Sequence, residues 1–330
     1  MSFHSERLGE FAGVVRSDAA YIAHFSLSGS GGAANDERML KSKGGEAGAR
    51  WKLKPCAGDK AAGARPRRII VCADDFGMNA AVSEGILRLA AKRRITAVSC
   101  LSSTLSFHKD ARRLRGLDVD IGVHLNLTDE RFSARPGRGL PGLLARSYLR
   151  SLNLVQVSGQ IERQLDAFEA TLGQRPHFVD GHQHVHQLPQ IRDVLIDVLS
   201  RRYGDNLPWL RNSRPGLLEG LPFTARAKAQ AVGGLGAHRT AKNAQAAGIS
   251  TNRALLGVYD FRGGLDAYVR LMLQWLSNAE DGDLIACHPA FPAAAGQDFD
   301  HQRSAEFAVL NDIGFAASVD RKGLVLTRRP

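Results

Sequence analysis

The chain has 330 residues and an apolar fraction of 44%, which suits a globular protein built on one α/β barrel with extra segments. It contains no run of about 18 apolar residues to span a bilayer, and charged residues interrupt the N-terminal region where a secretory signal would lie, so we expect a cytoplasmic protein. The net charge is +11, of which +5 falls in residues 1–68, where 12 Lys/Arg stand against 7 Asp/Glu. Aromatic residues do not alternate with the remaining basic ones, so we expect a solvated basic surface and no nucleic-acid partner.

Residues 1–66 form an irregular segment rich in Gly, Ala, Ser and charged residues. Such a segment cannot bury enough apolar surface to fold, so we interpret it as a flexible extension or as the product of an upstream start codon. We expect the folded domain to span residues 67–330.

The four cysteines form no CxxC pair and show no zinc-finger spacing. Cys72, Cys100 and Cys287 each lie in an apolar, strand-like run, whereas Cys56 falls in the N-terminal segment. We therefore interpret the first three as small buried hydrophobic residues rather than disulfide partners or nucleophiles.

Apolar runs of strand length alternate with helical apolar stripes from Arg67 onward. The first strand, at residues 69–73, is followed by a helix that Asn79 caps and that ends near Arg94. Further strands are predicted at residues 97–101, 119–125, 176–180, 209–212, 254–258, 283–287 and 315–319. Helices are predicted at residues 107–114, 161–172, 190–202, 224–247, 266–276 and 304–310, a Pro/Gly/Arg-rich loop at residues 131–142, and an apolar tail at residues 324–326.

Strands that alternate with helices imply parallel pairing through βαβ crossovers. Seven or eight such strands predict an α/β fold, a modified (β/α) barrel that is irregular or incomplete, with a doubly wound open sheet as the alternative. A dinucleotide-binding fold lacks its fingerprint here, since no GxGxxG follows the first strand and no Walker loop is present.

Acidic and imidazole side chains gather where the predicted strands end. The sequence places Asp74 and Asp75, His124, His182 and His288 at or just after the carboxyl ends of four different strands. In barrels and open α/β sheets the loops that form active sites converge at this edge. We therefore expect these five side chains to meet, although any one of them alone would be explained as a capping aspartate or a satisfied buried histidine.

One aspartate and two neutral imidazoles form an open three-ligand site for a divalent ion, with positions left for water and substrate. A second carboxylate beside the first can act as general base on that water. The residues alone therefore indicate a metal-dependent hydrolase. They leave open whether the bond is an amide or a phosphoester, and a basic nucleic-acid-binding protein with a structural histidine cluster is a further alternative.

Three motifs carry a resemblance to a known family: residues 73–77 (ADDFG), residues 122–127 (GVHLNL) and residues 180–186 (DGHQHVH), the last followed by Leu188 and Pro189. Together they resemble the YdjC-like carbohydrate deacetylases, which include chitooligosaccharide deacetylases and hopanoid-biosynthesis-associated deacetylases. The similarity extends from about Arg67 to about Val319.

The resemblance implies a (β/α) barrel related to NodB-type polysaccharide deacetylases and the removal of an N-acetyl group from an amino sugar or oligosaccharide. It implies that Asp75, His124 and His182 hold a divalent metal, Mg²⁺ or else Zn²⁺, and that Asp74 is the general base. His288 matches a late family histidine and is our candidate for the acid that protonates the departing amine. Contacts to the substrate or to the ligands are expected from Asn126, His184, His186 and Arg211.

The sequence does not distinguish among N-acetylated sugars. The loop from Arg131 to Leu143 and the Ala-rich region from Thr224 to Ala247 are expected to shape the substrate pocket or to form the contact of a homodimer.

Overall fold

The computed structural model describes residues 65–128, 139–292 and 298–330. Three predictions fall wholly or partly outside these ranges. They are the flexible extension as far as residue 64, the interpretation of Cys56, and the predicted loop as far as residue 138. The fold that follows is that of the described residues.

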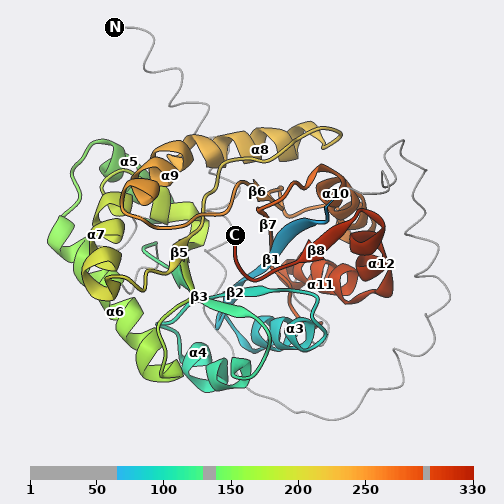
Figure 1. Ribbon diagram of the computed structural model, residues 1–330, viewed down its shortest axis with the longest axis horizontal. Coiled ribbons are helices and arrows are strands. Elements are labelled where there is room, and N and C mark those ends of the chain that lie inside the picture. The colour runs from blue at the N-terminus through green and yellow to red at the C-terminus, as the bar shows by residue number, and fades with distance from the viewer. Residues whose placement is uncertain (1–64, 129–138, 293–297) are drawn as a thin grey trace, which may run out of the picture.

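Eight parallel strands form one curled sheet at the centre of the molecule (Figure 1). Seven follow the order β5-β4-β3-β2-β1-β7-β6, and β8 pairs with the first residues of β1. Isolated bridges join Leu210 to Thr251 and Pro215 to Leu255, so the two edges of the sheet approach each other. The strands are β1 (Arg67–Phe76), β2 (Ala97–Cys100), β3 (Asp120–Leu125), β4 (Phe178–Gly181), β5 (Trp209–Leu210), β6 (Leu255–Leu256), β7 (Asp283–Cys287) and β8 (Leu324–Leu326).

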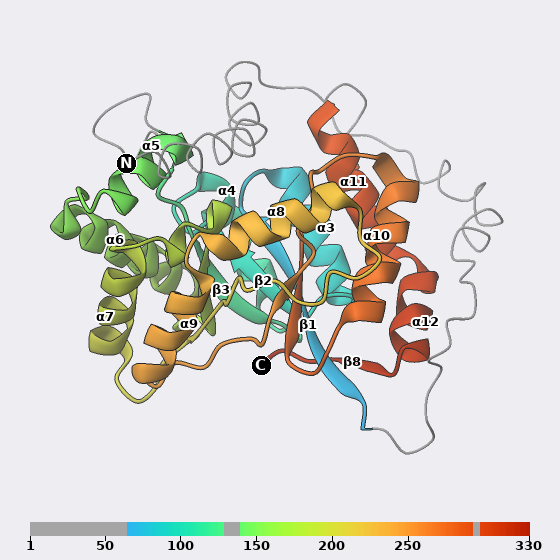
Figure 2. The ribbon, with the colours of Figure 1, turned by 90° about the horizontal axis from the view of Figure 1, so that it is seen from above.

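The helices surround the sheet and cover its outer face (Figures 1 and 2). In Figure 2, β8 and the C-terminus lie at the lower side with the beginning of β1, so the carboxyl ends of the strands face the opposite side. The helices are α3 (Ala80–Ala91), α4 (Leu105–Asp110), α5 (Gly139–Tyr148), α6 (Leu154–Leu172), α7 (Ile191–Tyr203), α8 (Phe223–Gly234), α9 (Ala237–Ala246), α10 (Gly264–Asn278), α11 (Asp298–Asn311) and α12 (Ile313–Arg321), together with the 3-10 turns η1 (Ala111–Leu114) and η3 (His182–Gln187).

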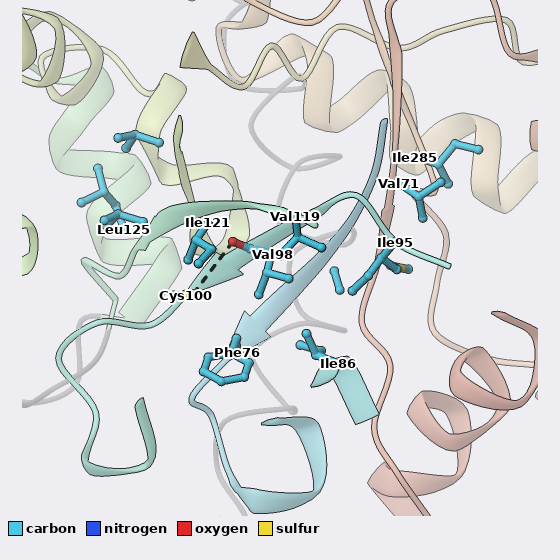
Figure 3. Packing of buried hydrophobic residues seen from close by; sticks show 14 of the residues in the cluster. Val71, Phe76, Ile86, Ile95, Val98, Cys100, Val119, Ile121, Leu125 and Ile285 are labelled. Atoms are coloured by element: carbon cyan, nitrogen blue, oxygen red, sulfur yellow. Dashed lines mark hydrogen bonds between the residues drawn. The ribbon is translucent and has the colours of Figure 1, made fainter. Parts of the chain in front are cut away.

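Two apolar cores lie on opposite faces of the sheet, because successive side chains of a strand alternate between its faces. The outer core packs residues such as Val71 and Val98 against helices. Figure 3 shows Phe76, at the end of β1, and Ile86 of α3 on this side of the sheet. The inner core is smaller and consists of Ile70, Cys72, Ala97, Phe178, Trp209, Leu255, Leu284 and Ala286. It fills the barrel below the carboxyl ends of the strands.

The predicted modified barrel of parallel strands is confirmed, as are the strands at its centre and most of the helices. Asn79 caps α3 as predicted, since its side chain accepts a hydrogen bond from the Val82 amide at 2.9 Å. The apolar tail at residues 324–326 forms β8. Cys72, Cys100 and Cys287 are buried and free of disulfides, as expected.

Residues 315–319, predicted as a strand, lie instead in helix α12. Asp312 caps this helix by accepting from the Gly314 amide at 2.6 Å, and Phe315, Ser318 and Val319 are buried at helical spacing. The short run could not be assigned by periodicity alone, because four or five apolar residues suit a buried strand and a helix equally.

Two other boundaries differ from the prediction. Residues 139–142, assigned to the loop, begin helix α5, and the single helical region at residues 224–247 is two helices that break at Leu235 and Gly236. Within the described ranges no helix is both long and apolar enough to cross a membrane.

Candidate active site

The end of β1 brings two adjacent carboxylates to the same side of the sheet. In a regular strand Asp74 and Asp75 would point to opposite faces. Asp75 however has a left-handed backbone with φ of 69°, and the pairing with β2 shifts register between Ala73 and Phe76. A non-glycine residue in this conformation is strained, and such strain gathers at functional sites. The irregularity turns Asp75 back towards the barrel axis, where Asp74 already points.

Asp75 lies beside two imidazoles from neighbouring strands. Its Oδ1 is 3.1 Å from His182 Nδ1 and 3.4 Å from His124 Nε2. One ligand atom from each of the three residues lies within 4.8 Å of the others. His124 is on β3, and His182 is the first residue after β4, so the predicted convergence of strand ends does bring these residues together. The three can hold a metal ion.

The far nitrogen of His124 is anchored by a residue on the next strand. His124 and Asp180 are register partners of β3 and β4, so their side chains share a face, and Nδ1 lies 2.7 Å from Asp180 Oδ1. Ser99 of β2 donates to the same oxygen at 2.5 Å and lies 2.9 Å from the ring nitrogen. Since a carboxylate only accepts, Nδ1 carries the proton. Nε2 therefore faces Asp75, and it offers a lone pair to a metal ion once its own proton is released.

Electrostatics around this cluster favour charge on both Asp75 and His124. Burial alone would raise the pKa of Asp75, but the Arg303 guanidinium, 2.5 Å from Oδ2, and His182 hold that pKa well below its usual range. Burial opposes the charged form of His124, yet the carboxylates of Asp180 and Asp75 raise its pKa to about 10. A pocket that draws a proton onto a buried imidazole is a pocket that attracts cations.

Arg211 ties Asp74 to Asp180. Its Nη1 and Nη2 donate to the two oxygens of Asp74 at 2.6 Å each, and Nη2 is 2.5 Å from Asp180 Oδ2. Cys72 Sγ lies 3.0 Å from the same Nη2, and burial raises the pKa of that thiol well above its usual value. The atoms of Cys72, Asp74 and Asp180 also lie within 4.8 Å of one another, but the guanidinium is the cation among them. Arg211 thus contacts the predicted base rather than the open side of the site.

His288 follows β7 and lies on the other side of Asp74. Its Nε2 is 3.8 Å from Asp74 Oδ2, and its ring packs edge-on against Phe261 with centroids 4.8 Å apart. Burial lowers the pKa of His288 to about 4, so the ring is neutral at neutral pH. The five residues predicted from strand ends therefore lie in one continuous cluster.

The remaining predicted residues lie farther from the ligand atoms. His186 Nε2 donates to the Arg211 carbonyl at 3.0 Å, and burial lowers its pKa to about 4. His184 Nδ1 is 3.1 Å from Ser213 Oγ, and burial together with electrostatic repulsion between the two imidazoles when both are protonated holds the pKa of His184 well below its usual value. Asn126 Oδ1 accepts from the amide and hydroxyl of Thr128, in the turn after β3. Of the three, His186 and Asn126 thus hydrogen-bond to the main chain, and His184 contacts a serine side chain.

Four buried polar residues of the site were not predicted: Asp180, Ser99, Arg303 and Glu306. Asp180 and Ser99 carried a signal, because each falls on the inward-facing alternation of a predicted strand: Asp180 is the register partner of His124, and Ser99 pairs with Gly122, two residues before His124 on the same face. Arg303 and Glu306 lie on α11 and reach the site from outside the sheet, so strand periodicity could not find them.

The chain is similar in sequence to a known protein family and to several named deacetylases. A family profile described as YdjC-like protein matches residues 68–321. The carbohydrate deacetylase of Homo sapiens is 34% identical over 154 residues, which are 42% of this chain and 47% of that protein. The carbohydrate deacetylase of Geobacillus stearothermophilus is 28% identical over 280 residues, 79% of this chain and 96% of that protein. The chitooligosaccharide deacetylase of Citrobacter koseri is 30% identical over 136 residues, 39% of this chain and 54% of that protein.

The chain thus spans about half the length of the human and Citrobacter relatives and nearly all of the Geobacillus one. Among solved structures, a protein of Enterococcus faecalis superposes with a TM-score of 0.57 at 22% identity, covering 80% of this chain and 97% of that chain. At this identity the likeness concerns the fold alone.

Proposed function

The chain belongs to the YdjC-like protein family, and on that premise we propose that it is a metal-dependent hydrolase that removes the N-acetyl group from an amino sugar or oligosaccharide. One observation carries the proposal: the ligand atoms of Asp75, His124 and His182 lie within 4.8 Å of one another. The two other predicted participants, Asp74 and His288, lie beside this cluster, 3.8 Å apart. The names of the similar proteins, carbohydrate and chitooligosaccharide deacetylase, support an N-acetylated sugar as substrate.

The three residues fit a divalent ion by their chemistry and by the groups behind them. Asp180 fixes the proton of His124 on Nδ1, so that Nε2 is left as a ligand, and Arg303 takes Oδ2 of Asp75, so that Oδ1 is left as another. Asp75, His124 and His182 would therefore hold the ion, which when bound lowers the pKa of water and polarises a carbonyl group. The family resemblance implies Mg²⁺, whereas two imidazoles favour Zn²⁺, so both ions belong in the test.

Asp74 is suited to take the proton of the attacking water. Arg211 donates a hydrogen bond of 2.6 Å to each of its two oxygens, and this pair of bonds fixes the plane of the carboxylate beside the ligand cluster. As the water loses its proton to Asp74, its oxygen adds to the carbonyl carbon of the N-acetyl group. Asp74 has no place among the three ligands, so it remains available as a base.

His288 is suited to deliver a proton to the departing nitrogen. Because the ring is neutral at neutral pH, that proton has to arrive during the reaction, and Asp74 Oδ2 at 3.8 Å is the nearest source. A histidine whose pKa is low is a strong acid once it is protonated. When the carbon–nitrogen bond breaks, the nitrogen takes this proton and leaves as a free amine, and acetate remains.

The test is acetate release from N-acetylglucosamine oligomers, measured with the protein loaded with Mg²⁺ or Zn²⁺ and compared with phosphate release from an aryl phosphate ester. Asp74→Asn should keep its metal by elemental analysis and lose turnover, whereas His124→Ala and His182→Ala should lose the metal. Asp120→Asn, a buried carboxylate at the amino end of β3, is the matched control and should keep both. Phosphate release without acetate release, or normal turnover by Asp74→Asn, would contradict the proposal.

A further inference from the structure

Helix α11 holds the main chain of the residue that follows β7. The His288 amide donates to Glu306 Oε2 at 2.6 Å, and Arg303 Nη1 donates to the His288 carbonyl at 3.4 Å. Two residues on, the Ala290 amide donates to the Arg303 carbonyl at 3.1 Å. Arg303 and Glu306 are three positions apart, so they share one face of the helix. This face of α11 therefore binds both the amide and the carbonyl group of His288.

Glu306 is fully buried, and its hydrogen bonds account for its presence there. Tyr259 donates to Oε1 at 2.6 Å and Tyr268 to Oε2 at 3.2 Å, in addition to the His288 amide. Burial raises the pKa of Glu306 to about 7, in spite of these three donors. An apolar side chain of similar volume at a buried position often gives a fold of equal or greater stability than a carboxylate does. The role of Glu306 therefore lies in the groups that it orients.

The same carboxylate reaches the ring of His288 by a second route. Tyr259 stacks on Phe261 with centroids 4.9 Å apart, and Phe261 packs against the His288 ring in a T-shaped contact with centroids 4.8 Å apart. Phe261 has a left-handed backbone with φ of 59°, a strained conformation for a bulky residue. His288 Nδ1 has no hydrogen-bond partner among the described residues, so packing and the main chain have to orient the imidazole.

We propose that Glu306 is a positioning residue for His288. It holds the main chain of His288 directly and its ring through Tyr259 and Phe261, and so keeps Nε2 facing Asp74. Arg303 extends the arrangement to the metal site, since its Nη2 is 2.5 Å from Asp75 Oδ2 while its Nη1 contacts His288. One helix thereby sets the distance between a predicted metal ligand and the predicted acid. The catalytic consequence rests on the proposed function, whereas the positioning of the ring does not.

The kinetic test compares two substitutions of Glu306. Glu306→Met removes every acceptor and should lower kcat by about tenfold or more, with KM and metal content unchanged, because displacement of a reacting group by about 1 Å can reduce a rate by about a hundredfold. Glu306→Gln keeps a carbonyl oxygen for the His288 amide and should restore most of kcat. Asp283→Leu, which removes another buried carboxylate at the amino end of β7, should lower stability and leave kcat unchanged.

A spectroscopic test needs no turnover. In the full chain labelled with ¹⁵N-histidine, the His288 amide is assigned by its absence in His288→Gln, and it should move upfield in Glu306→Gln, where a neutral acceptor replaces the carboxylate. Tyr259→Phe removes a single hydroxyl and should leave the amide in place but change the His288 ring signals. An unchanged amide in Glu306→Gln, or a kcat in Glu306→Met equal to that of wild type, overturns the inference. Absence of deacetylation by the wild type refutes the proposed function and leaves the spectroscopic result valid.

Discussion

Asp180 is the carboxylate whose loss should weaken metal binding most without removing a ligand. Its Oδ1 accepts from His124 at 2.7 Å and from Ser99 at 2.5 Å, and its Oδ2 is 2.5 Å from Arg211 Nη2. Asp180→Asn keeps the shape of the side chain and one carbonyl oxygen. It removes the negative charge and sets an amide NH₂ against either the guanidinium or the imidazole N–H.

Two magnitudes follow for Asp180→Asn. Loss of one partner of a buried ion pair costs about 3–5 kcal/mol, and the lower end applies because Arg211 keeps two hydrogen bonds of 2.6 Å to Asp74. Metal affinity should fall by about 10- to 100-fold, or roughly 1.4–2.7 kcal/mol, since His124 loses the charge that fixes its tautomer and raises its basicity.

Urea unfolding of the metal-free protein measures the first effect, and competition with a chelator measures the second. Asp120→Asn is again the control, because Asp120 is equally buried but accepts from Trp209 Nε1 at 3.2 Å at the opposite end of the barrel. It should lower stability and leave metal affinity unchanged. If Asp180→Asn binds the ion as tightly as wild type, or if both variants lose affinity equally, Asp180 does not orient His124.

Two further predictions concern stability. Gly77→Ala should destabilise the fold by about 2 kcal/mol or more in urea unfolding, because φ is +90° and a Cβ would lie 2.7 Å from Phe107 Cβ. Gly116→Ala is the control: φ is +82° but the space around a Cβ is open, so the loss should be only about 1 kcal/mol. Equal losses in the two variants would refute the steric reasoning. Glu306 should make stability depend on pH: its pKa rises from 4.5 to about 7 on folding, so its contribution is fully present below pH 4.5 and is lost as the pH rises through 7. The free energy of unfolding of wild type relative to Glu306→Gln should therefore fall by about 3 kcal/mol between pH 4 and pH 8, and a difference independent of pH would contradict this.

The parallel barrel and the convergence of the candidate ligand residues were predictable because each depends on a short-range pattern. Buried parallel strands appear as continuous apolar runs, and the candidate ligands lie where these runs end. Position alone groups Asp74, Asp75, His124, His182 and His288 without knowledge of any helix, and the family resemblance selects Asp75, His124 and His182 among them as the expected ligands. Asp180 could have been found in the same way, since the two-residue alternation puts it level with His124 on the inner face.

The contribution of α11 could not be predicted from the sequence. Arg303 and Glu306 become part of the site only because that helix packs where β7 ends, and a helical stripe does not reveal which loop its polar side chains will meet. The backbone at Asp75 and Phe261 is a similar case, since a left-handed conformation at a non-glycine residue arises from the tertiary structure and not from local preference. The role proposed for His288 depends on both of these features.

The charges at the carboxyl end of the barrel do not cancel. Asp74, Asp75 and Asp180 supply three carboxylates, and Arg211 and Arg303 supply two guanidiniums, all buried. In the metal-free protein the surplus of one negative charge is offset by a proton on His124, whose pKa these carboxylates raise to about 10. A divalent ion would reverse the balance to one positive charge, the sign that stabilises negative charge developing on an amide oxygen under attack. An arrangement that holds a proton in the metal-free protein would thus become complementary to the transition state of the proposed deacetylation when an ion replaces that proton, so variants of this network should change stability and metal affinity together.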